Sequence, residues 1–119
     1  MSEQVAWLLE MNIKPGAADS FKAVMNEMIE ATRANEPGTL NYEWSLSEDG
    51  STCHLYERYA NSAATMTHLA SFGANYAERF LAAVQPTRFT IYGNPDAQVR
   101  SALDPFSPTY MTSAAGFAR

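Results

Sequence analysis

The sequence has little of what would direct it to nucleic acid or to a membrane. Only eight of its 119 residues are Lys or Arg, they are scattered, and the net charge is −5. No basic stripe is therefore available to neutralise a phosphate backbone or an anionic membrane surface. No apolar run approaches the length of a membrane span, and no signal-peptide pattern is visible at the N-terminus. We expect a cytoplasmic protein that binds neither nucleic acid nor membrane.

Residues that hold metals, disulfides or nucleotides are equally sparse. The single cysteine, Cys53, excludes an internal disulfide. It shares no ligand spacing with the two histidines, His54 and His68. No glycine-rich phosphate loop follows a predicted strand, and nucleophile patterns such as Gly-x-Ser-x-Gly are absent. We predict a protein without a metal or a cofactor.

The residues that are present describe one globular α+β domain. Hydrophobic residues make up 46% of the chain and charged residues 18%, which is a globular composition. Alternating and helical apolar patterns predict, in order, a strand, a helix, two strands, a helix and a strand: Val5 to Ile13, Asp19 to Ala34, Leu40 to Leu46, Cys53 to Tyr59, Ala63 to Val84 with a bend at Gly73, and Thr87 to Tyr92 after Pro86. This β-α-β-β-α-β order is ferredoxin-like, with the helices on one face of an antiparallel sheet.

A C-terminal segment follows this domain. We assign residues 1–93 to the ferredoxin-like domain and residues 94–119 to a helix and docking tail of the same domain. Asn94-Pro95-Asp96 predicts a helix start with Asn94 as the cap, and the helix should reach about Leu103. The rest is irregular but rich in large apolar residues, so we expect it to dock on its own domain or on a partner subunit.

Three segments together resemble the antibiotic biosynthesis monooxygenase-like family. Residues 36–43, EPGTLNYE, are similar to its turn and second strand, usually seen as E-P-G-x-x-x-Y. Residues 55–59, LYERY, resemble its third strand, where a glutamate sits between aromatic residues. Ala63-Ala64 followed by His68-Leu69 is similar to its second helix. The resemblance covers roughly residues 4 to 93.

The resemblance implies a homodimer whose two sheets face each other, which is a dimeric α/β barrel. It also implies a cofactor-independent monooxygenase, an oxidoreductase, acting on a small aromatic phenol, quinol or anthrone. Fold alone does not settle function, so a non-catalytic small-molecule-binding module or a structural homodimer stays open, as does an isomerase or decarboxylase. The haem-degrading branch is disfavoured, because three of its functional residues are replaced in this sequence. Glu78 stands where that branch has its axial histidine, His68 stands where it has a helix tryptophan, and its first-strand asparagine would lie near Leu9.

Glu57 and His68 are the candidate catalytic residues. Strand alternation places Glu57 on the face that meets the helices, where it is a general base, an acceptor that orients a phenol or His68, or a structural carboxylate. His68 lies beside the apolar stripe of the second helix, next to Leu69. Its imidazole either accepts a proton from a bound phenol near neutral pH or is a half-buried side chain with one hydrogen bond.

Four further residues are candidates for substrate binding. Tyr42 and Trp44 lie on the apolar sheet face and either line a pocket for a flat ligand or belong to the core. Asn75 and Tyr76 follow Gly73 and could close such a pocket.

The second sheet face mixes apolar residues with charges of both signs. It could be the solvated face of a monomer. Alternatively, two copies could pair Glu10 or Glu43 with Arg58 or Arg88 across a two-fold axis.

Overall fold

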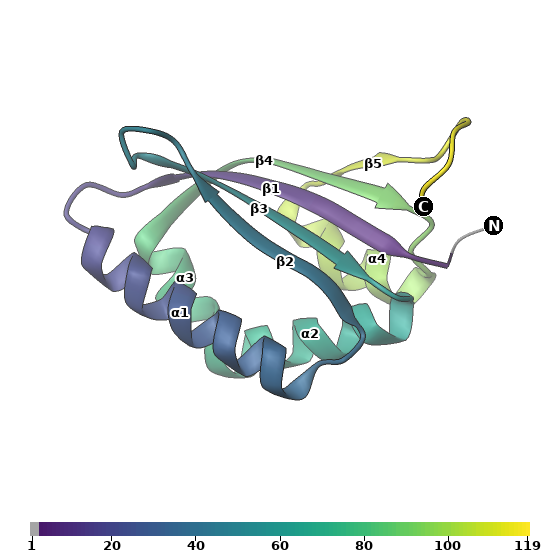
Figure 1. The fold of residues 1–119 in the computed structure, drawn as a ribbon, viewed down its shortest axis with the longest axis horizontal. Helices are drawn as coiled ribbons and strands as arrows, with labels where there is room; N and C mark the ends of the chain where they lie inside the picture. The colour runs from purple at the N-terminus through teal and green to yellow at the C-terminus, as the bar shows by residue number, and fades with distance from the viewer. Residues whose placement is uncertain (1–2) are drawn as a thin grey trace.

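The computed structural model describes residues 3–119 and confirms the ferredoxin-like α+β fold (Figure 1). One five-stranded sheet has the order β2-β3-β1-β4-β5. The elements are, in chain order, β1 (Val5–Ile13), α1 (Ala18–Asn35), β2 (Thr39–Leu46), β3 (Thr52–Tyr59), α2 (Ser62–Asn75), α3 (Ala77–Ala83), β4 (Val84–Gly93), α4 (Ala97–Leu103), the 3₁₀ turn η1 (Asp104–Phe106) and β5 (Thr109–Met111).

The central strand β1 pairs antiparallel with both β3 and β4, and only β5 runs parallel to its neighbour β4. β4 begins at Val84, earlier than the predicted start at Thr87, and so includes Pro86. The β1–β4 register shifts between Glu10 and Met11, and Pro86 lies opposite Met11 at this irregularity. A bulge tolerates a residue without an N–H, which explains how proline enters the strand.

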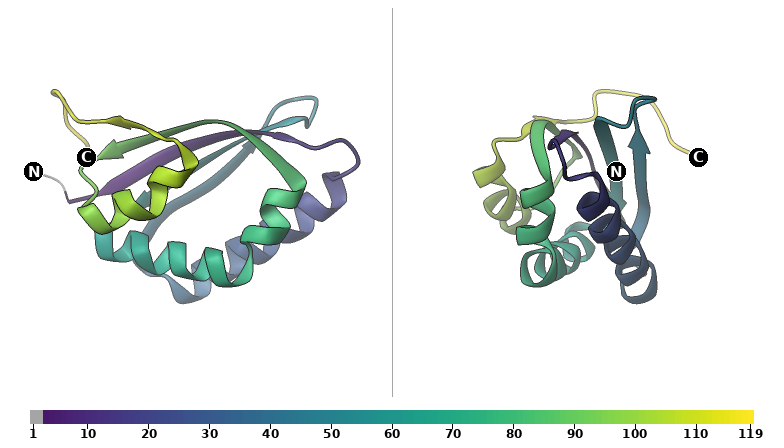
Figure 2. Two further views of the ribbon diagram at one scale, coloured as in Figure 1. Left: turned by 180° about the vertical axis from the view of Figure 1, so that it is seen from behind. Right: turned by 90° about the vertical axis from the view of Figure 1, so that its left-hand side faces the viewer.

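All four α-helices cover one face of the sheet, and the other face carries none (Figures 1 and 2). The second helical region divides at Tyr76, where φ is −131°, and not at Gly73 as predicted. The half-buried Tyr76 ring packs against the main core, so tertiary packing sets this break. Gly73 stays inside α2.

Two apolar clusters lie between the sheet and the helices. The larger one joins α1 and α3 to the sheet and contains Phe21, Met28, Leu55 and the fully buried Cys53. The smaller one, which includes Trp7, joins β1, β3 and β4 to α4. Within residues 3–119, no helix is long and apolar enough to cross a membrane.

The C-terminal segment folds back over the domain. Its helix α4 is capped by Asp96, whose side chain accepts from the Val99 N–H at 2.9 Å, and not by Asn94 as predicted. The Asp96 N–H donates to Ser62 Oγ at the start of α2, which explains why the cap lies two residues later. After η1, β5 adds to the edge of the sheet, while the Phe117 side chain is 81% exposed.

Candidate functional site

Glu57 is buried on the helix-facing side of β3 and is held by three donors. Trp7 Nε1 on the neighbouring strand donates to Glu57 Oε2 at 2.5 Å, and the Tyr59 hydroxyl donates to Oε1. His68 Nε2 lies 3.2 Å from the same Oε1. β-strand alternation brings Glu57 and Tyr59 to one face, and the β1–β3 register sets Trp7 directly opposite Glu57. Donors at both oxygen atoms therefore fix the orientation of the Glu57 carboxylate.

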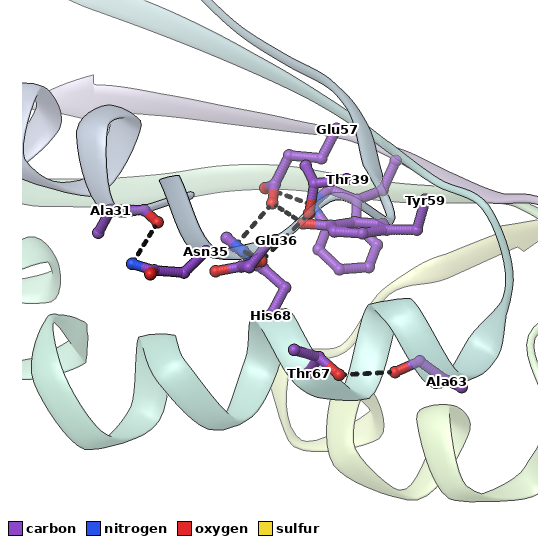
Figure 3. A network of polar contacts seen from close by, with 10 residues as sticks. Ala31, Asn35, Glu36, Thr39, Glu57, Tyr59, Ala63, Thr67 and His68 are labelled. Atoms are coloured by element: carbon purple, nitrogen blue, oxygen red, sulfur yellow. Dashed lines mark hydrogen bonds and ion pairs between the residues drawn. The ribbon is translucent and has the colours of Figure 1, made fainter. Parts of the chain in front are cut away.

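His68 lies between two buried carboxylates (Figure 3). Its Nδ1 is 2.8 Å from Glu36 Oε1, which also accepts from the Thr39 hydroxyl at 3.1 Å. Glu36 follows the last residue of α1, β3 supplies Glu57, and α2 supplies His68. Three elements far apart in sequence thus form one polar chain, the Glu36–His68–Glu57 chain.

The two carboxylates determine the charge of the imidazole. Burial lowers the pKa of His68, but hydrogen bonds to Glu36 and Glu57, together with their negative charges, outweigh burial and raise that pKa to about 9. His68 is therefore an imidazolium at neutral pH, and both of its N–H groups point at carboxylates.

Glu36 was not predicted as a site residue, because in the sequence it stands out only as part of the E-P-G turn. It is only 8% exposed, because α2 packs His68 directly over it. A carboxylate next to a Pro-Gly turn ordinarily faces solvent, and the contact that buries it comes from 32 residues further along the chain. The sequence feature that could have pointed to this site residue is the glutamate of the E-P-G turn itself.

A cavity of about 130 Å³ lies beside the Glu36–His68–Glu57 chain. Its walls are almost wholly apolar, and Glu57 and His68 are the charged residues among those that line it. The remaining lining residues are Trp7, Leu9, Met28, Tyr42, Leu55, Leu69, Phe72, Phe80, Leu81, Pro86, Phe89, Leu103 and Phe106. The deepest of these are buried, whereas Leu81, Pro86 and Phe106 are exposed and mark the mouth.

The predicted site residues divide into two groups. Glu57, His68 and Tyr42 all line the cavity. Trp44 lies behind it and packs edge-on against Phe21, Tyr42 and Phe80. Asn75 is exposed and Tyr76 packs into the main core, and neither lines the cavity.

Tyr42 has a buried hydroxyl with no partner at hydrogen-bonding geometry among residues 3–119. Its ring lies edge-on to the His68 ring, with 5.2 Å between ring centroids. Burial, followed by the charge of Glu57, raises the pKa of Tyr42 well above its ordinary value, although the nearby Thr32 side chain moderates the rise. Tyr42 is therefore a neutral phenol in the wall of the cavity, and its hydroxyl makes no hydrogen bond of full geometry.

Within the described part of the chain, no group of three His, Cys, Asp or Glu side chains could hold a metal ion. The two buried carboxylates lie on opposite sides of the His68 ring, so the three groups do not converge on one point. What the arrangement offers is proton transfer, hydrogen bonding and exclusion of water.

Comparisons with solved structures agree on the fold. The crystal structure of MupZ from Pseudomonas fluorescens has a TM-score of 0.86 at 24% identity, and the match covers 100% of this chain and 91% of that one. Rv0793 from Mycobacterium tuberculosis has a TM-score of 0.66 at 28% identity, over 78% of this chain and 96% of that one. SnoaB, a cofactor-independent oxygenase from Streptomyces nogalater, has a TM-score of 0.64 at 16% identity, over 81% of this chain and 97% of that one.

The family assignment rests on the sequence. No curated protein matches the chain. The family described as antibiotic biosynthesis monooxygenase matches residues 5–86, which is more than half of the chain. This span contains Glu36, Glu57 and His68, and it agrees with the resemblance found in the sequence motifs. The chain belongs to the antibiotic biosynthesis monooxygenase family.

Proposed function

We propose that the protein is a cofactor-independent monooxygenase of a small, electron-rich phenol or quinol. One observation carries the proposal: His68 lies between two buried carboxylates at the floor of an apolar cavity. Burying charged groups costs stability even when they are paired, and perturbed titratable groups beside a cavity are typical of functional sites. The family and the oxygenase SnoaB among its structural relatives support the same class of reaction.

In this proposal Glu57 accepts the proton of the substrate hydroxyl. A carboxylate has about four acceptor positions, and Trp7, Tyr59 and His68 use three. The one that remains belongs to Oε2, which has a single donor. For His68 the sequence left two alternatives, a proton acceptor near neutral pH or a half-buried side chain with one hydrogen bond. A pKa of about 9 keeps it charged at neutral pH. Its role is instead to stabilise the negative charge that develops beside it.

The substrate supplies all the electrons in this reaction. Deprotonation gives an electron-rich phenolate that passes an electron to O₂. A carbon–oxygen bond then forms at a ring carbon that carries hydrogen. The O–O bond breaks, one oxygen atom stays as a quinone carbonyl, and the other leaves as water. For a phenol, C₆H₆O and O₂ give C₆H₄O₂ and H₂O, so no external reductant is required. The protein contributes a base, positioning and a dry cavity.

Tyr42 is the proposed substrate-binding donor. Tyr42 lines the cavity and its ring packs edge-on against His68. Its hydroxyl makes no hydrogen bond of full geometry, although the Thr32 side chain lies close to it. An unpaired buried donor costs stability, so a ligand oxygen that accepts from Tyr42 would satisfy it and gain binding energy. A phenolate oxygen would then lie between a neutral donor and the region of the imidazolium. Trp44, Asn75 and Tyr76 lie outside the lining and would act on the ligand only indirectly.

The enclosed part of the cavity suits about one ring. An apolar cavity of about 150 Å³ holds one benzene molecule, and the cavity here is about 130 Å³. A three-ring anthrone would therefore extend beyond the enclosed space and through the mouth. The lining contains no Lys or Arg, so a neutral molecule is favoured over a carboxylate or a phosphate ester.

The test is oxygen consumption with hydroquinone, catechol and anthrone. Wild type should turn over a one-ring quinol, while Glu57→Gln and His68→Ala should each lose about a hundredfold or more, the usual contribution of acid–base groups. Glu48→Gln, in the exposed β2–β3 hairpin, is the matched control and should retain full activity. Binding without oxygen consumption would favour the non-catalytic alternative, and unchanged turnover in both variants would reject the site.

The proposal includes a homodimer formed through the open face of the sheet. That face carries no helix, and it exposes Tyr92 by 42% and Met111 by 49% beside the half-buried Tyr56 (Figure 1). Arg58 already bonds Asn41 and Gln4 within its own chain, so Arg88 is the arginine better placed to meet a partner.

Light scattering tests the dimer. The chain has a mass of 13.1 kDa, so wild type should have twice this mass at micromolar concentration. Tyr56→Glu should shift it toward monomer, whereas Lys22→Glu on the exposed side of α1 should not. A wild-type monomer would remove this part of the proposal.

A further inference from the structure

We infer that the C-terminal segment of residues 94–119 forms one wall of the cavity and that its Phe106 sets the size limit of the ligand. The size limit rests on the proposed function, since it requires the cavity to bind a ligand. The control of access to the cavity does not. Phe106 would thus be a specificity-determining residue that lies outside the span matched by the family.

Two residues of this segment line the cavity, Leu103 from α4 and Phe106 from η1. Leu103 is 2% exposed and packs in the cluster that contains Trp7, so it forms the inner part of the wall. Phe106 is 52% exposed although it is a large apolar side chain. It shares the mouth with Leu81, which is 37% exposed and comes from α3. Phe106 therefore stands at the mouth, where a ligand has to pass.

The segment is fixed on both sides of η1, at residues 96 and 109–111, so Phe106 is held in place. Before η1, Asp96 bonds Ser62 of α2. After η1, β5 pairs with β4, and the Tyr110 hydroxyl donates to Asp104 Oδ1 at 2.6 Å. The Arg100 guanidinium lies 4.2 Å from the centre of the Tyr110 ring, which ties α4 to the same strand. These contacts bracket η1, the turn that carries Phe106. Figure 2 shows this C-terminal segment, in yellow-green to yellow, running from α4 along the edge of the sheet.

The wall formed by residues 94–119 lies outside the span that the family matches. The family match ends at residue 86, before the segment begins. The matches to Rv0793 and SnoaB cover 78% and 81% of this chain, whereas the match to MupZ covers 100%. The polar chain of Glu36, His68 and Glu57 lies within the family span. Leu81 and Pro86 at the mouth also lie within this span, whereas Phe106 lies beyond it, so the same chemistry could be fitted to ligands of different length.

The first test measures access and needs no ligand. Trp7 lies at the floor of the cavity and is 3% exposed, and Trp44→Phe leaves it as the single tryptophan. In that background, Phe106→Ala should raise the acrylamide quenching constant of Trp7 by about twofold or more, because shortening the side chain opens the mouth. Phe117→Ala removes an equally large ring that is 81% exposed and should change nothing. Equal quenching in Trp44→Phe and in the two variants made in its background would show that Phe106 does not form a wall of the cavity.

The second test measures the size limit with phenol and 2-naphthol in calorimetric titrations. Wild type should bind phenol and discriminate against 2-naphthol. Phe106→Ala should improve the affinity for 2-naphthol by about tenfold or more, which is the usual effect of small steric changes in an apolar pocket. The affinity for phenol should change much less. An unchanged naphthol-to-phenol ratio in Phe106→Ala would overturn the size limit and leave the proposed function standing. Failure of wild type to bind either probe would overturn the proposed function and the size limit. The quenching result would still show whether Phe106 limits access to the cavity.

Discussion

The Nδ1 atom of His68 lies 2.8 Å from Oε1 of Glu36, and this contact joins the middle of α2 to the end of α1. The other ring nitrogen reaches Glu57 on β3 at 3.2 Å, so one imidazole connects both helices to the sheet. The same side chain is thus a structural link and the central group of the candidate site. The predictions below separate these two roles.

The charge on His68 should make stability depend on pH. Its pKa is about 9 in the folded protein against an ordinary value of 6.5. The stabilisation, about 3 kcal/mol, is therefore complete below about pH 6.5 and is lost as pH rises through about 9. Urea unfolding should show the difference between wild type and His68→Gln shrinking by this amount from pH 6 to pH 10. A difference that stays constant over this range would contradict a charged His68.

Glu36→Gln should lower the pKa of His68. The variant keeps the shape of the side chain but removes one of the two charges that face the imidazole. The titration of the His68 ring protons by NMR measures the pKa, and the signals of the exposed His54 are identified with His54→Asn. Activity should fall together with the pKa if Glu36 acts through His68. An unchanged His68 pKa would show that Glu36 is only a turn residue.

Tyr42→Phe and Tyr59→Phe should have different effects on stability. The Tyr42 hydroxyl makes no hydrogen bond of full geometry and has only the nearby Thr32 side chain to lose, so its replacement should change the free energy of unfolding by about 1 kcal/mol or less. Tyr59 donates to Glu57, and its loss should cost about 1–3 kcal/mol. Ligand binding should nevertheless weaken in Tyr42→Phe, as measured by calorimetric titration. If this variant binds as tightly as wild type, Tyr42 is not the donor to the ligand.

Gly38 is required where β2 begins close to α2. A Cβ atom at this position would lie 2.6 Å from the Cβ of Ala64 on α2, so Gly38→Ala should push the helix away and cost about 1–3 kcal/mol. Gly73 offers the matched control, because a Cβ there meets nothing within 4 Å. Gly73→Ala should stabilise the protein by about 0.5–1 kcal/mol through helix propensity. Thermal unfolding of both variants checks the pair, and equal melting temperatures would refute the close contact.

Much of the fold could be predicted because its pattern is local. Alternation identified the helix-facing side of each strand, and so the buried position of Glu57, since only one side of this sheet is covered by helices. The break at Tyr76 could not be predicted, because local propensity favours Gly73 and the packing of an aromatic ring decided otherwise. Asp96 replaced Asn94 as the cap for a similar reason: both can cap, and the contact with Ser62 selects one.

The candidate site was only partly visible in the sequence. Glu57 and His68 stood out as polar residues in apolar patterns, and both line the cavity. Glu36 did not, because its burial depends on a helix that packs over it from further along the chain. The short strand β5 and the turn that carries Phe106 also lack a periodic signal, since segments of three residues are too short to show one.

The buried Cys53 has a practical consequence. It is the only thiol in the chain, it is 0% exposed, and burial raises its pKa to about 11. A thiol-reactive dye would therefore remain unreacted with the native protein and modify it only when β3 separates from the helices. The labelling rate would report how often the interior opens, with the natural sequence and without an engineered probe.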